Sequence, residues 1–313
     1  MKKDVGEAQF EASVEQDLAE TEEVAQQAIA ADPQSLEATS WQRAREVVKG
    51  FKPVPWFIWR IANYVLGKPG DVRSLSEGAL FGLRKLICGI ASDPSIGSGE
   101  SVTTTRRALE VVPHDIIAAG AVIHAICRRL GGRDFERIWR PIIDDAILRA
   151  HIGFIVGEQC PDFGGGRGML AGFAGRSGLA VLIGCGTKEQ AQGALEGLAA
   201  GGDIATVGLK VYGCNPLQVS AMLLSASGVG KDAAFGSVSY AIIDRAGAVL
   251  TNKEQQRWLA AFAIAEALRM NRPEGIAPGW WAALDLSDPG EQAELIERTV
   301  PLIRRGTHWG WLE

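Results

Sequence analysis

The stretch GMLAGFAGRSGLAVLI, from Gly168 to Ile183, is the most apolar part of the middle of the chain and carries glycines at helical spacing. In a helix, Gly168, Gly172, Gly175 and Gly178 follow one another at steps of four, three and three residues and share one narrow face. Each glycine costs a helix interior about 1 kcal/mol relative to alanine. The row therefore indicates that another element packs close to this backbone, and we favour a tight helix–helix contact over a ligand site.

Composition sets the scale of the fold around this stretch. The chain has 313 residues, of which 47% are hydrophobic and 22% charged, enough for one large domain or two small ones. The formal net charge is −5, but residues 1–32 hold nine acidic side chains against Lys2 and Lys3, so the rest carries about +2. We expect no basic face for nucleic acid.

The cysteines and the N-terminus indicate the compartment. The five cysteines are widely spaced, odd in number and without a CxxC motif, so neither a disulfide framework nor a zinc knuckle is expected. The N-terminus is acidic where a secretory signal would be basic and then apolar, and apolar runs such as 116–126 are too short to span a bilayer. We predict a cytoplasmic protein with no membrane partner.

Hydrophobic periodicity predicts an all-α architecture, because strand-like alternation persists nowhere for long. Helices are expected over residues 5–31, 36–50, 75–92, 114–130, 135–157, 168–183, 187–201, 253–270 and 291–304. The first is acidic with a thin apolar stripe. This helix either lies on the body of the protein, extends toward a partner, or forms a solvated leader. Thr187, with Gln190 three residues on, predicts a capping box.

The central stretch resembles the central helix of HDOD domains, a bacterial branch of the HD superfamily with the approximate pattern LAGLLHDIGxLxL. The positions that match this pattern or replace it conservatively are Met169, Leu170, Ala171, Gly172, Phe173, Gly178 and Leu182. The two residues that name the superfamily are replaced, because Gly175 stands at the histidine position and Arg176 at the aspartate position.

Three further segments extend the resemblance. The stretch KPVPWFIWRIANYVL, residues 52–66, resembles the LPxLP segment that opens the HDOD domain. Trp139 is followed two residues later by Pro141, at a position that is histidine in metal-binding HD proteins. In VGLKVYGCNPLQVSAMLLSASGVG, residues 207–230, Pro216 replaces another family histidine. The residues of this last segment that follow the family pattern are Tyr212, Gly213, Val219, Ala221, Leu223 and Leu224.

The resemblance implies an HDOD-like helical bundle over residues 50–275, preceded by an acidic helical leader and entry helix over 1–49 and followed by a tryptophan-rich extension over 276–313. HD phosphohydrolases hold metal ions with histidines and aspartates and so activate a water molecule. Because Pro141, Gly175, Arg176 and Pro216 stand at four ligand positions, the resemblance implies no metal and no cofactor. We expect a non-catalytic bacterial signalling or regulatory module that binds a protein partner, or a small ligand in the former active-site cleft.

The alternative is a divergent metal-dependent phosphohydrolase that uses Asp144, Asp145 and His151. Asp145 and His151 are six residues apart and poorly placed on one helix face, which counts against it. For Arg176 we hypothesise a buried ion pair with Asp145 or Asp144 that replaces the charge of the metal. The other possibility is that Arg176 extends to solvent.

Two further groups of residues are candidate binding sites. The segment GGGRG, residues 164–168, is interpreted as an interhelical loop, and Arg167 with Gly168 is the place where a small anion would bind. Four tryptophans lie in the extension, and they either pack on the body of the chain or form a partner surface. They are Trp280, Trp281, Trp309 and Trp311.

Overall fold

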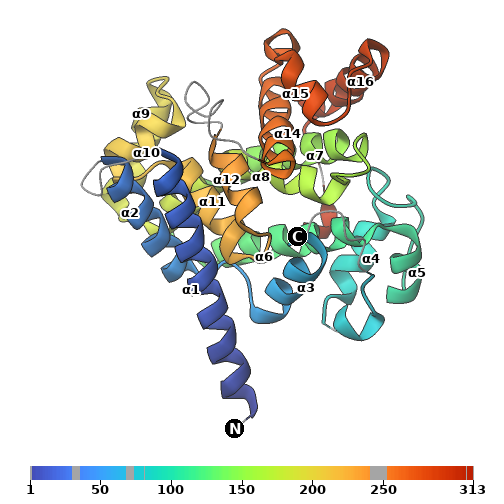
Figure 1. Ribbon diagram of the computed structural model, residues 1–313, viewed down its shortest axis with the longest axis horizontal. Helices are drawn as coiled ribbons and strands as arrows, with labels where there is room; N and C mark the ends of the chain where they lie inside the picture. The colour runs from blue at the N-terminus through green and yellow to red at the C-terminus, as the bar shows by residue number, and fades with distance from the viewer. Residues whose placement is uncertain are drawn as a thin grey trace.

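The computed structural model describes residues 2–29, 36–67, 74–80, 82–239, 252–307 and 309–312, and within these ranges it contains helices and no strand. The predicted all-α class is therefore confirmed (Figure 1). The α-helices are α1 Lys2–Ile29, α2 Leu36–Phe51, α3 Trp56–Leu66, α4 Arg84–Ser92, α5 Thr105–Val111, α6 His114–Leu130, α7 Glu136–Glu158, α8 Gly165–Cys185, α9 Lys188–Ala199, α10 Ile204–Tyr212, α11 Pro216–Ala226, α12 Lys231–Ser239, α14 Lys253–Arg269, α15 Pro278–Ala283 and α16 Pro289–Arg305. The 3₁₀ helices are η1 Glu77–Leu80, η3 Pro273–Gly275 and η4 Gly310–Leu312.

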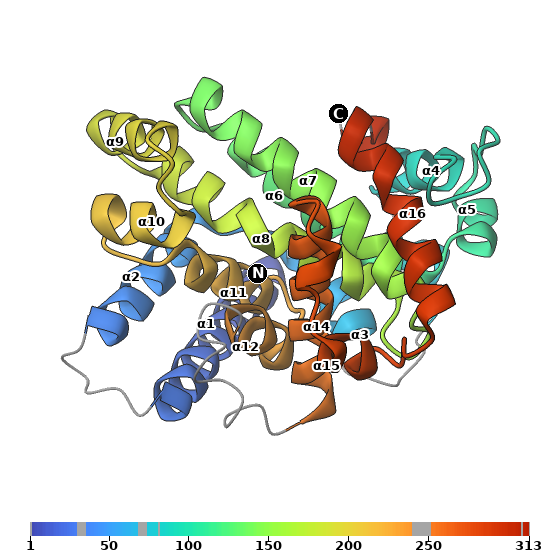
Figure 2. The same cartoon turned by 90° about the horizontal axis from the view of Figure 1, so that it is seen from above.

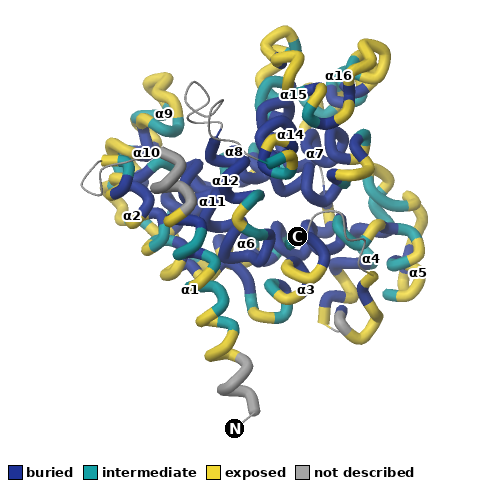
Figure 3. Tube along the Cα trace, viewed as in Figure 1, coloured by how far each residue is buried: buried dark blue, intermediate teal, exposed yellow. Residues whose placement is uncertain are grey.

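Helix α8 is the centre of the bundle, and α6, α7, α11 and α14 pack around it. Figure 2 shows α7 and α8 running side by side, and Figure 3 shows that α8 is buried over most of its length. With 21 residues it is long and apolar enough to cross a membrane, but 89% of its apolar window is buried inside the protein. Its apolar sequence is accounted for by this central position.

The glycines of α8 allow two helices to approach it closely. A Cβ atom on Gly172 would lie 2.6 Å from the carbonyl carbon of Arg149 in α7, and one on Gly168 would lie 2.9 Å from the Cα atom of Gly157. Because these neighbours are backbone atoms, no side-chain rotation could make room. The tight helix–helix contact expected from the glycine row is confirmed.

The four glycines do not all face the same partner. A Cβ atom on Gly178 would lie 2.8 Å from the backbone nitrogen of Ser220 in α11, whereas one on Gly175 would meet the Cδ atom of Arg149 at 3.3 Å. Steps of three residues fall short of a full turn, so the row rotates around the helix and passes from α7 to α11.

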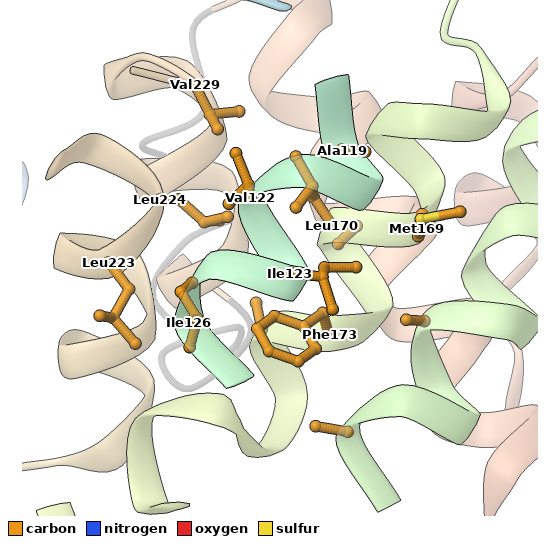
Figure 4. Close-up of a cluster of buried hydrophobic side chains, with 14 of the residues drawn as sticks. Ala119, Val122, Ile123, Ile126, Met169, Leu170, Phe173, Leu223, Leu224 and Val229 are labelled. Atoms are coloured by element: carbon orange, nitrogen blue, oxygen red, sulfur yellow. The ribbon is translucent and has the colours of Figure 1, made fainter. Parts of the chain in front are cut away.

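Apolar side chains from α6, α8 and α11 meet in the core beside these contacts (Figure 4). Ile123 of α6 and Phe173 of α8 are both completely or almost completely buried there. The same continuous core includes Leu18 of the leader and Trp309 of the C-terminal extension. All three sequence segments therefore contribute to one core.

Helix α1 lies on the body of the protein, which was one of the two alternatives for the leader. It packs against α2, α11 and α12. Leu18 is fully buried, and the Thr21 hydroxyl donates a hydrogen bond of 2.9 Å to the Ser225 hydroxyl of α11. Arg45 of α2 forms an ion pair of 2.9 Å with Glu22. These contacts fix the middle of α1 in place.

Most predicted helices agree with the structure, but the segment 164–168, interpreted as an interhelical loop, is part of α8 from Gly165 on. The helix expected over 75–92 is divided into η1 and α4, and Gly82 between them has a φ of +96°, a conformation that favours glycine. The capping box predicted at Thr187 is present, with its hydroxyl accepting from the Gln190 backbone nitrogen at 3.3 Å.

Candidate functional site

Charged side chains meet where α7, α8 and α14 pack together. Arg149 and Asp145 come from α7, Arg176 from α8, and Glu266 and Arg269 from α14. Arg149 is only 2% exposed, and the other four are partly buried. We call these five residues the arginine–carboxylate cluster.

Asp145 is the centre of the arginine–carboxylate cluster. Its carboxylate lies 2.8 Å from Nε of Arg149, 3.3 Å from Nε of Arg176 and 2.6 Å from Nε of Arg269. Glu266 pairs with Nη1 of Arg149 and lies 3.4 Å from Nη2 of Arg176. Each carboxylate therefore joins arginines from at least two helices.

Three guanidinium groups against two carboxylates leave the cluster with an excess of one positive charge. Burial raises the pKa of the Asp145 carboxyl, but Arg149, Arg269 and Arg176 outweigh that effect and hold its pKa below the usual range. Burial and the nearby Arg176 lower the pKa of Arg149, although a guanidinium stays protonated in proteins. The cluster is thus ionised and cationic at neutral pH.

The buried pair hypothesised for Arg176 is present with Asp145 and not with Asp144. Asp144 is exposed and takes no part in the cluster. Sequence reasoning missed Arg149, although it lies four residues after Asp145 at the spacing of helical ion pairs. Glu266 and Arg269 carried no such signal, because more than a hundred residues separate them from α7.

The four positions that the resemblance aligns with metal ligands differ in their surroundings. Pro141 is exposed and is the sixth residue of α7, beyond the first turn where a proline fits best. Gly175 lies beside the Arg149 side chain, and Pro216 is buried at the first position of α11, with its carbonyl against Gly178. None of these residues offers a metal-binding side chain.

The side chains present at this site do not fit a metal centre. Nowhere in the described ranges do three or more His, Cys, Asp or Glu side chains gather as metal ligands would. The two carboxylates of the cluster already accept from arginines, and the excess positive charge would repel a divalent cation. We derive no chemistry through a metal here.

The proposed anion position at the start of α8 is taken up by protein groups. The Asp115 carboxylate accepts a hydrogen bond of 2.8 Å from the Gly166 backbone nitrogen, so it interacts with the positive end of the helix. Arg167 is buried, donates to the carbonyl oxygens of Phe163 and Leu66 at 3.2 Å each, and lies 3.6 Å from Glu254. Gly168 belongs to the α7 contact.

The tryptophans of the extension pack on the chain itself, which corrects the partner-surface alternative for three of the four. Trp281, Trp309 and Trp311 are buried, and Trp280 is half-buried. Trp309 and Trp311 stack with ring centroids 5.1 Å apart, and Nε1 of Trp309 donates to the Ser95 hydroxyl at 3.3 Å.

His151 belongs to this tryptophan environment and not to the cluster. Its ring centroid lies 4.9 Å from that of Trp309, and Nδ1 is 2.6 Å from the Thr307 hydroxyl. Burial lowers the pKa of His151 to about 4. Asp145 faces arginines, Asp144 faces outward and His151 faces the extension, so the structure does not join the three residues of the divergent-enzyme alternative.

Comparison with known proteins gives one informative match. No family model matches the chain, and no curated protein matches it. Among solved structures, it is similar to a protein of Shewanella amazonensis SB2B described as a candidate phosphohydrolase, with a TM-score of 0.60 and 14% identity over 86% of this chain and 96% of that one. At this identity the likeness concerns the fold alone, and the chain shares an all-α fold with that protein.

Proposed function

We propose that the protein is a non-catalytic regulatory module, an HDOD-like member of the HD superfamily that acts in the bacterial cytoplasm by binding a protein partner or a small ligand. The arginine–carboxylate cluster carries the proposal. It contains Arg176 and lies beside Gly175, the positions that the resemblance aligns with the aspartate and histidine of the superfamily. The fixed positive charges of the guanidinium groups attract the carboxylates there, as the positive charge of a metal ion would.

The chemistry of the cluster supports a structural role better than a hydrolytic one. Metal-dependent hydrolysis needs an open coordination position where water becomes acidic enough to attack. Guanidinium groups are always protonated, so they can neither coordinate such a water molecule as a metal ion does nor accept its proton. They can, however, tie three helices together, as the contacts from α7 to α8 and α14 do.

A hydrolysis assay tests the proposal. Purified protein is incubated with p-nitrophenyl phosphate and bis-p-nitrophenyl phosphate in the presence of Mn²⁺, beside its Asp145→Asn and Asp144→Asn variants. We expect no release of nitrophenol above the blank for any of the three proteins. Metal-dependent release by the parent protein would refute the proposal, and loss of that release in both variants would favour the divergent phosphohydrolase that uses Asp144 and Asp145.

A further inference from the structure

A second region of the molecule, separate from the arginine–carboxylate cluster, has the form of a binding groove. It has a volume of about 960 Å³ and is lined by the 53–55 connector, α3, α4, α6 and η4. Its apolar lining includes the half-buried ring of Phe57 and the indole of Trp311. Its size is at the upper end of the range typical of small-molecule sites, roughly 300–1,000 Å³.

The groove is strongly cationic. Lys85, Arg128 and Arg129 line it, and none of them forms an ion pair with a carboxylate in the part of the chain that the structure describes. Arg129 donates only to the Lys52 carbonyl oxygen, at 3.2 Å. The carboxylate of Asp93, the acidic residue of the lining, instead accepts hydrogen bonds from the backbone and hydroxyl of the nearby Ser95. These three cations therefore form no direct ion pair within the described ranges, unlike the arginines of the cluster, and with Asp93 the charged lining has a net charge of +2.

Two buried polar atoms beside the groove lack partners within the described ranges. They are Nε1 of Trp311, whose side chain is 8% exposed, and Nδ1 of His124. Both residues line the groove. Buried polar groups normally have hydrogen-bond partners, so an ordered water molecule is the expected partner of each of these atoms.

We propose that this groove binds an anionic small molecule of nucleotide size, with a phosphate group on Lys85, Arg128 and Arg129 and a planar ring beside Phe57 and Trp311. Ammonium and guanidinium groups form strong, charge-assisted hydrogen bonds with phosphate oxygens. Aromatic side chains bind flat rings by stacking or edge contact. The groove and the arginine–carboxylate cluster share no residue, so ligand binding in the groove does not depend on the proposed function. Only the regulatory effect of that binding rests on it.

Isothermal titration calorimetry with ADP as the probe tests the groove, with pyrophosphate and adenosine as its separated halves. We expect ADP to bind more tightly than either half. The Lys85→Gln/Arg128→Gln variant is expected to lose about tenfold or more in affinity. The control Lys188→Gln/Lys210→Gln removes the same charge from exposed positions of α9 and α10 outside the groove and is expected to leave the affinity unchanged.

A third variant tests the ring contact. Phe57→Leu should weaken ADP binding and leave pyrophosphate binding unchanged, and circular dichroism checks that each variant is folded. Absence of ADP binding up to about 1 mM, or an equal loss in the control variant, would overturn the inference. Pyrophosphate binding as tight as ADP binding, with no effect of Phe57→Leu, would overturn the ring site. Phosphate release from ADP during the titration would instead contradict the proposed function and leave the groove as a binding site.

Discussion

Replacing Asp145 by asparagine should destabilise the fold far more than the same change at the adjacent Asp144. Asp145 accepts from three arginines of three helices, at distances between 2.6 and 3.3 Å. Its carboxylate is 21% exposed, so most of its surroundings are protein. Asp144 is exposed and outside the cluster, which makes it a matched control.

The magnitude follows from the charges left behind. Without the Asp145 carboxylate, three guanidinium groups face Glu266 alone, and the excess rises from one positive charge to two. Removing one partner of a fully buried ion pair costs about 3–5 kcal/mol. Partial exposure screens part of this, so we expect Asp145→Asn to lower the free energy of unfolding by about 2–4 kcal/mol. For Asp144→Asn we expect a change within about 0.5 kcal/mol.

Urea unfolding followed by circular dichroism at 222 nm measures both variants against the parent protein at pH 7.5. The slope of the transition should be unchanged and the midpoint should fall for Asp145→Asn only. Equal stability of the two variants would refute the inferred role of the cluster.

The glycine contact and the buried histidine give two further predictions. Gly172→Ala should lower the free energy of unfolding by at least about 2 kcal/mol, because its Cβ atom would lie 2.6 Å from the Arg149 carbonyl carbon. The control Gly193→Ala, in the middle of α9 and with its nearest neighbour at 3.7 Å, should raise the free energy of unfolding by up to about 1 kcal/mol. Similar melting temperatures for the two variants would contradict the close contact. The pKa of His151 is about 4 in the folded protein, against an ordinary value of 6.5. Between these pH values the unfolded chain binds a proton at this residue that the folded protein does not. The free energy of unfolding should therefore fall by about 3 kcal/mol from this residue as the pH falls from 6.5 to 4. His151→Gln should remove this part of the pH dependence in urea titrations at pH 4.5 and 7, and an unchanged dependence would show that His151 is not buried in its neutral form.

Local sequence signals predicted the helices and their ends well. Helix α6 begins and ends at the predicted residues, and the capping box at Thr187 formed because both of its hydrogen bonds are made within four residues. The break between η1 and α4 was missed because the apolar periodicity of the sequence continues through it. At this break Gly82 has a φ of +96°. The glycines of α8 predicted a closely packed neighbour but did not indicate which helix it would be.

The candidate site was only partly predictable for the same reason. A pair of Arg176 with Asp145 or Asp144 was one of two possibilities that the resemblance and helix geometry allowed, and the structure has the pair with Asp145. Glu266 and Arg269 reach the site through the packing of α14, which no local pattern encodes. The cationic groove was also missed, because it combines short segments from α3, α4, α6 and η4 that are remote in sequence.

Metal content tests the central claim most directly. The protein is purified without a metal-affinity tag from cells grown with added manganese, iron and zinc, and its metals are quantified by mass spectrometry. Replacement of the metal site by the arginine–carboxylate cluster predicts less than about a tenth of an equivalent of any transition metal. Near-stoichiometric metal that is lost in Asp145→Asn would contradict it.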